Sequence, residues 1–166
     1  GSVKISSGFS KILESGSISV QSAIGSSNGG SGGIRVATGE AKNGKSGNIM
    51  LNTGDSMSFT TGSISMHAGS GSFNGGNVEI SAGQSNLGTG GEIQIMSGKS
   101  VSGSSGNVMI NTGDSGVSGR SGSIEIETGK AGSGGSGSVN LITGASLSGT
   151  SGGIVLSVGN SASGKG

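Results

Sequence analysis

One short sequence unit recurs about every 15 residues along the whole chain. Its pattern is Ser-Gly-x-(Ile/Val)-x-(apolar)-x-(Thr/Ser/Ala)-Gly-x-(Ser/Ala/Gly)-x-x-Gly-x, and we number its positions 1 to 15. Two clear copies begin at Ser46 and Ser105, reading Ser-Gly-Asn-Ile-Met-Leu-Asn-Thr-Gly-Asp-Ser and Ser-Gly-Asn-Val-Met-Ile-Asn-Thr-Gly-Asp-Ser. A short fixed period is typical of repeat proteins, in which each unit buries its apolar side chains only by stacking on its neighbours.

Two positions of the unit are always apolar, and they are separated by one residue. Position 4 is Ile or Val and position 6 is Ile, Val, Leu or Met in all eleven copies. The spacing between copies varies from 14 to 16 residues, and the variation falls in the Gly/Ser-rich half of the unit. That half is therefore predicted to form the turns. Position 4 is occupied by Val3, Ile18, Ile34, Ile49, Ile64, Val78, Ile93, Val108, Ile124, Val139 and Ile154, and position 6 by Ile5, Val20, Val36, Leu51, Met66, Ile80, Ile95, Ile110, Ile126, Leu141 and Leu156.

The alternation of apolar and other residues has a period of two, which places positions 4 and 6 on one face of a strand. The glycines at positions 2 and 9 disfavour a helix and suit turns that need a positive φ. We therefore predict an all-β fold, a narrow parallel β-solenoid (β-helix) with about 15 residues per coil and about eleven coils. In this fold, position 4 should form one interior row, which would include Ile49, Ile64, Val78, Ile93 and Val108.

The composition excludes several classes of protein. The chain has 166 residues, 40 of them Gly, with no Pro or Cys and a formal net charge of +1. A nearly neutral chain that is 2% aromatic lacks the basic field and the stacking platforms of a nucleic-acid binder. No apolar run approaches the roughly 18 residues of a membrane span. No nucleic-acid partner and no membrane span are therefore expected.

The whole chain, residues 1–166, is predicted to be one repeat domain, in which residues 1–14 form a divergent first repeat. Both ends of the predicted solenoid would expose unpaired strand edges, formed by Val3 and Ile5 in the first coil and by Ile154 and Leu156 in the last coil, residues 151–166. An exposed parallel edge is a template for another copy. Two alternatives follow: copies associate head to tail through these edges, or the sequence is a segment of a longer repetitive chain.

The sequence offers little chemistry for catalysis. His67 is the only histidine and stands at an outward position of its strand, and there is no Cys. Ser and Thr recur in register with the repeat, which indicates structural positions and not one activated nucleophile. An enzyme needs acids, bases or cations gathered in one groove. We therefore predict no catalytic residues, no cofactor and no enzymatic activity.

One pair of carboxylates is a candidate cation site. Glu40 and Asp55 both occupy position 10, in consecutive units, so two like charges would lie one rung apart in the predicted solenoid. Such a pair could hold a hard cation such as calcium. Lys42 and Lys45 lie nearby in the sequence and could neutralise the two carboxylates instead. Because the calcium-binding β-roll repeat Gly-Gly-x-Gly-x-Asp is absent, no metal site is predicted, and Glu40 and Asp55 stay only a candidate.

The threonines at position 8 raise an alternative function. Thr ranks on short coils resemble those of insect antifreeze proteins, which bind ice through flat rows of Thr. Here the Thr column lies in phase with the apolar positions and is interrupted by Ala and Ser, so ice binding is not the favoured interpretation. A surface-binding module that presents a flat β-solenoid face to ice, mineral or polysaccharide stays the alternative. The column contains Thr38, Thr53, Thr112, Thr128 and Thr143, with Ala68, Ala82 and Ser97 as the interruptions.

The unit Ser-Gly-x-Ile-x-Ile-x-Thr-Gly also resembles tandem repeats of large extracellular proteins of microalgae. The resemblance covers the whole chain, and it implies a surface or matrix protein whose repeats form a stalk or fibre. We therefore expect a structural extracellular or cell-surface protein that forms or extends a stiff filament by coil stacking. Its expected partners are copies of itself or further repeats of a longer chain, with extracellular matrix or polysaccharide as further candidates.

Overall fold

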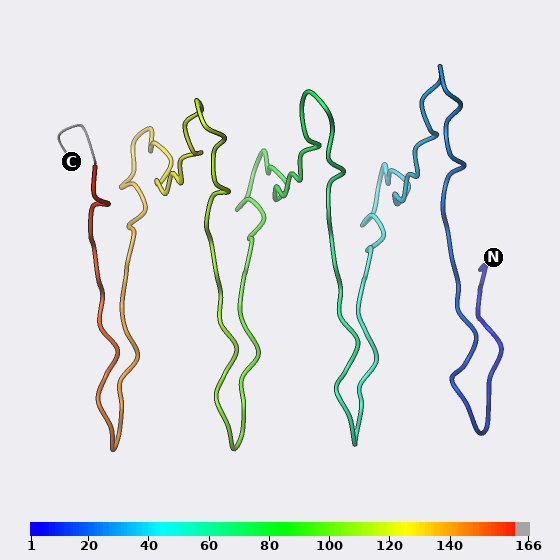
Figure 1. The fold of residues 1–166 in the computed structure, drawn as a ribbon, viewed down its shortest axis with the longest axis horizontal. Helices are drawn as coiled ribbons and strands as arrows, with labels where there is room; N and C mark the ends of the chain where they lie inside the picture. Colours follow the sequence, from blue (N-terminus) through cyan, green and yellow to red (C-terminus); the bar gives the residue numbers. More distant parts are fainter. Residues whose placement is uncertain (162–166) are drawn as a thin grey trace. The chain divides into compact units, whose positions relative to one another are not determined.

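The chain runs as a series of extended segments joined by bends (Figure 1). The computed structural model describes residues 1–161. Within this range it contains no helix and no strand, only extended backbone, bends and turns, and so no helix that could cross a membrane. The chain divides into two compact parts, Gly1–Ile80 and Ser81–Gly166, each of which contains several repeat units. The described residues of each part show the same alternation of extended segments and bends.

The predicted parallel β-solenoid, or β-helix, is wrong for the described residues. No strand ladder joins their extended segments, and no hydrophobic side chain among them is buried. The period-two pattern identifies an extended backbone and the residues that share a face, but it does not identify the neighbour of each segment. The predicted interior row is exposed: Ile49, Ile64, Val78, Ile93 and Val108 keep 53, 55, 59, 51 and 52% of their surface accessible.

The accessible surface shows how little of the chain is covered. The chain exposes 17089 Å². A folded monomer of this mass would expose about 7,200 Å², and an unfolded chain about 22,500 Å². About three quarters of the unfolded surface therefore stays accessible to solvent. Local backbone order is present in this chain, but a hydrophobic core is absent from its described residues.

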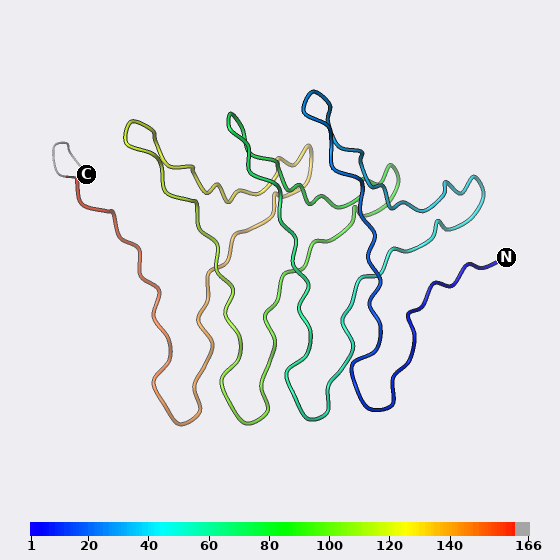
Figure 2. The same cartoon turned by 45° about the vertical axis from the view of Figure 1, so that its right-hand side comes forward.

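The bends recur with the period of the sequence. We call positions 3 to 8 of each unit its segment and positions 9 to 15 its corner. The bends lie in the corners, which confirms that the Gly/Ser-rich half of the unit carries the changes of direction (Figures 1 and 2). They span 11–13, 42–44, 57–59, 72–73, 86–88, 101–103, 132–134 and 147–149, and hydrogen-bonded turns replace them at 27–28 and 117–118.

The glycines allow other backbone atoms to approach closely, and none of those described adopts a left-handed backbone conformation. No described residue has a positive φ, so the expectation of positive-φ turns is wrong. Two glycines at position 11 are required because the chain folds back on them. A Cβ at Gly25 would overlap the carbonyl oxygen of Gly29, and a Cβ at Gly71 would overlap the carbonyl oxygen of Asn74. These two corners therefore exclude any side chain at that position.

Candidate functional site

Among the described residues, four corners are closed by one hydrogen bond between two glycines. In the first corner, the backbone N–H of Gly16 donates to the carbonyl oxygen of Gly8 at 3.0 Å. These residues occupy position 9 of one unit and position 2 of the next. The equivalent bond is 2.9 Å long between Gly76 and Gly69, between Gly91 and Gly83 and between Gly106 and Gly98. The bond brings the end of one segment next to the start of the following segment.

The side chain at position 8 lies against the glycine at position 2 of the next unit. A Cβ at Gly47 would come within 3.3 Å of Cγ2 of Thr38, and a Cβ at Gly76 within 3.1 Å of Cβ of Ala68. This proximity explains why position 8 is small or Thr and why position 2 is Gly. The same proximity recurs at nine successive junctions, at Gly16, Gly32, Gly47, Gly62, Gly76, Gly91, Gly106, Gly122 and Gly137.

We expect the chain to show negligible thermal hysteresis, because four of its five position-8 threonines lie against the position-2 glycine of the next unit and the column is interrupted by Ala and Ser. Thr112, for example, is half-buried, and its Cγ2 lies at 3.3 Å from the place of a Cβ at Gly122. The measurement is nanolitre osmometry on the purified protein. Hysteresis that disappears when Thr112, Thr128 and Thr143 are all changed to Val would contradict the expectation.

A serine at position 11 supports many of the corners. The Oγ of Ser100 accepts a hydrogen bond from the backbone N–H of Gly103 at 2.8 Å. This is the serine turn motif, in which a hydroxyl satisfies an N–H that the bend leaves without a backbone partner. Equivalent bonds of 2.8 to 3.1 Å to the residue three positions later are made by Ser10, Ser56, Ser85, Ser100 and Ser146.

The two corners of the 16-residue units are closed differently. Their extra residue allows a backbone turn, in which the N–H of Gly29 donates to the carbonyl of Ser26, and the N–H of Gly119 to that of Gly116, both at 3.1 Å. The Oγ of Ser115 also donates to the carbonyl of Gly119 at 3.2 Å. A side-chain hydroxyl and a backbone carbonyl are therefore alternative acceptors at equivalent corners.

Replacing Ser100 with Ala should loosen its corner. The change removes the acceptor of the Gly103 N–H, and a hydrogen bond of this kind contributes about 0.5–1.5 kcal/mol. We expect the Gly103 amide to exchange its hydrogen about 2 to 12 times faster, measured by NMR. Ser102→Ala, in the same corner, is the matched control because no hydrogen bond of Ser102 is present. Equal rates in the two variants would contradict the role given to Ser100.

The titratable side chains do not gather in the described part of the chain. Glu40, Asp55 and His67 are all exposed. Residues 1–161 contain no group of three or more His, Asp or Glu side chains that could hold a metal ion. Calcium takes six to eight oxygen ligands, more than the two carboxylates of Glu40 and Asp55 supply. Within residues 1–161, therefore, no third acidic or histidine side chain joins the candidate pair.

The predicted assembly residues are exposed. Val3 and Ile5, in the part Gly1–Ile80, keep 92 and 76% of their surface accessible. Ile154 and Leu156, in the part Ser81–Gly166, keep 52 and 90%. The edges to which they were assigned are not strands, because residues 1–161 contain none. Residues 162–166 of the predicted last coil lie outside the described range.

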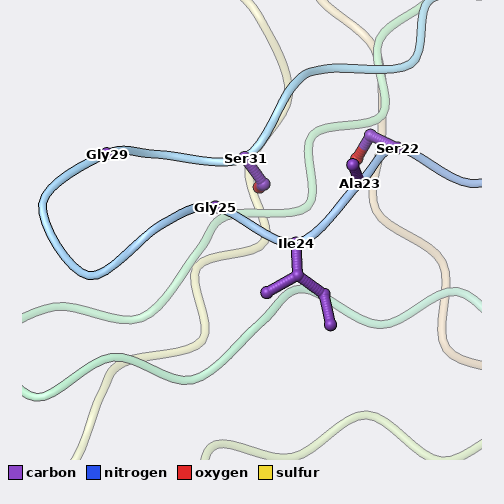
Figure 3. A pocket seen from close by; sticks show the side chains of 6 residues that line it. All are labelled: Ser22, Ala23, Ile24, Gly25, Gly29 and Ser31. Carbon is purple, nitrogen blue, oxygen red and sulfur yellow. The ribbon is translucent and has the colours of Figure 1, made fainter.

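Along the described residues, one open hollow lies in the part Gly1–Ile80 and another in the part Ser81–Gly166. The first is lined by the corner of the second repeat and the residues on either side of it, Ser22, Ala23, Ile24, Gly25, Gly29 and Ser31. Ile24 points away from the loop between the two glycines (Figure 3). It has no charged lining residue. The second is lined by Ile124, Val155, Leu156, Ser157 and Val158. Neither hollow brings together groups that could catalyse a reaction.

Sequence reasoning missed the contact between positions 8 and 2 and the hydrogen bond of the position-11 serine. Both left a signal: position 2 is Gly in every copy, and position 11 is Ser in most copies. Comparisons with protein-family models, with curated proteins and with solved structures find no match to this chain.

Proposed function

We propose that this chain is a structural, extracellular repeat protein that forms or extends a filament, stalk or matrix fibre by associating with further copies of itself. One observation carries the proposal: every repeat exposes its pair of large apolar side chains. At position 4 the exposed fraction is 49 to 59% from Ile18 to Ile154, and at position 6 it is 65 to 75% from Val20 to Leu141. Exposed apolar surface that continues over a whole chain favours association.

The regularity of this exposure supports a structural role. Consecutive repeats present the same apolar pair at nearly the same accessibility, so a partner that fits one repeat fits the next. An enzyme or a receptor for a small ligand needs instead one distinct concave site with convergent polar groups. The extracellular location rests on the resemblance to the repeats of microalgal surface proteins, and it is proposed on that ground alone.

The proposal is tested by sedimentation velocity and negative-stain electron microscopy of the purified chain over a wide range of concentration. We expect growth from monomer to larger species as concentration rises, and elongated particles in the micrographs. A chain that sediments as a monomer at every concentration would exclude self-association. Bovine serum albumin at the same mass concentrations controls for crowding effects.

A further inference from the structure

Within residues 1–160, the segments have no backbone hydrogen-bond partner. Among residues 1–160, the hydrogen bonds between backbone groups lie within the corners or join the glycines at positions 9 and 2 on either side of a corner, and none involves positions 3 to 8. Each segment therefore exposes a row of N–H and C=O groups along an extended backbone. Such a row is the feature that makes an unpaired strand edge a template for another chain.

The hollow in Ser81–Gly166 shows two segments of one chain that face the same space without pairing. Ile124, at position 4 of its unit, lines one part, and Val155, Leu156 and Val158 of a later unit line another. The hollow has a volume of about 840 Å³ and its lining is largely apolar. The side chains that line it include the position-4 and position-6 residues of the repeat. An occupant should therefore present apolar side chains at the same spacing.

We propose that extended segments of further copies of this chain lie in this hollow and along the other segments. They pair with the segments through backbone hydrogen bonds and form a sheet between molecules. The inference rests on the proposed self-association and specifies its contacts. Pairing must keep positions 4 and 6 of both chains on the same face, because a shift by one residue would turn every apolar side chain to the other face. Each pair of strands thus consists of one segment from this chain and one segment from a copy.

The period of the repeat identifies a copy of the chain as the occupant. A partner with the same spacing of 14 to 16 residues meets segment with segment and corner with corner over many units. A net charge of +1 adds little repulsion as copies accumulate. The chain exposes about 10,000 Å² more than a folded monomer of its mass. A standard protein interface buries about 1,600 Å², so enough surface is present for several contacts.

Hydrogen exchange followed by mass spectrometry, at concentrations where sedimentation shows monomer and then oligomer, tests the inference. We expect amides of positions 3 to 8 to exchange at least about a hundredfold more slowly in the oligomer. An oligomer whose segment amides exchange as fast as those of the monomer would overturn pairing and leave self-association standing. A chain that stays monomeric would overturn both.

A substitution in the middle of a segment gives a second measurement. Gln94→Pro removes one backbone N–H from the segment that contains Ile93 and Ile95, and proline is not accommodated inside a paired sheet. Gln94→Ala removes the same side chain and keeps the N–H. We expect Gln94→Pro to weaken association at least about tenfold and Gln94→Ala to leave it unchanged. Equal association of the two variants would count against backbone pairing.

Discussion

The double variant I64K/I93K should associate about ten to a hundred times more weakly than the unchanged chain. Ile64 and Ile93 are position-4 residues that keep 55 and 51% of their surface exposed in the single chain. Burying a fully exposed Ile side chain contributes about 1.5–3 kcal/mol, and only about half of each of these side chains is still exposed, so two lost side chains remove about 1.5–3 kcal/mol. Because about 1.4 kcal/mol corresponds to a factor of ten, the stated range follows. Sedimentation equilibrium measures the change.

The matched control is S65K/Q94K. It adds the same two positive charges one residue further along the same two segments, at position 5, which lies on the opposite face of the extended backbone. We expect the control to associate within about fivefold of the unchanged chain, because surface charges contribute little at ordinary ionic strength. If both variants lose association equally, charge and not the apolar face controls assembly.

Gly71→Ala should open one corner. A Cβ at Gly71 would overlap the carbonyl oxygen of Asn74, a backbone atom that moves only if the corner rearranges. Overpacking of this kind costs about 1–3 kcal/mol. The N–H of Gly76, which donates to Gly69 across the same corner, reports the opening. We expect its hydrogen exchange, followed by NMR, to accelerate about 5 to 150 times.

Gly69→Ala is the control for this prediction. It lies two residues away in the same corner, and a Cβ there would meet no atom within 4 Å. Both variants lose the same amount of glycine backbone freedom in the unfolded chain, so the comparison isolates the overlap with Asn74. Similar exchange rates for Gly76 in the two variants would show that the close approach at Gly71 has no energetic consequence.

The local features of the fold could be predicted from the sequence, and the architecture could not. The alternation around residues such as Ile49 indicates extended backbone, and the Gly/Ser-rich stretches indicate where the bends lie, because both features depend on residues close in sequence. The neighbour of each segment depends on pairing between distant residues. Because all eleven units share the same apolar pattern at positions 4 and 6, any segment matches any other at these positions, in the same chain or in another. Repetition thus removes the information that would identify the partner.

The contacts on either side of each corner could in part be predicted, because they too join residues that are close in sequence. Gly47 and Thr38 meet across nine residues of chain, a local contact whose signal is the joint occurrence of Gly at position 2 and a small residue at position 8. The candidate pair Glu40 and Asp55 was different, because it depended on the coils being stacked. Once the described residues show no such stacking, the argument for bringing these two carboxylates together is lost.

The two 16-residue units bear on how a gene for such a chain can change length. In them one additional residue is absorbed by a backbone turn, at Gly29 in one corner and at Gly119 in the other. The apolar pairs that follow, beginning at Ile34 and Ile124, keep the exposure of those in other units. Single-codon changes in a corner are therefore expected to be tolerated, whereas one within a segment would turn the remaining apolar side chain to the opposite face.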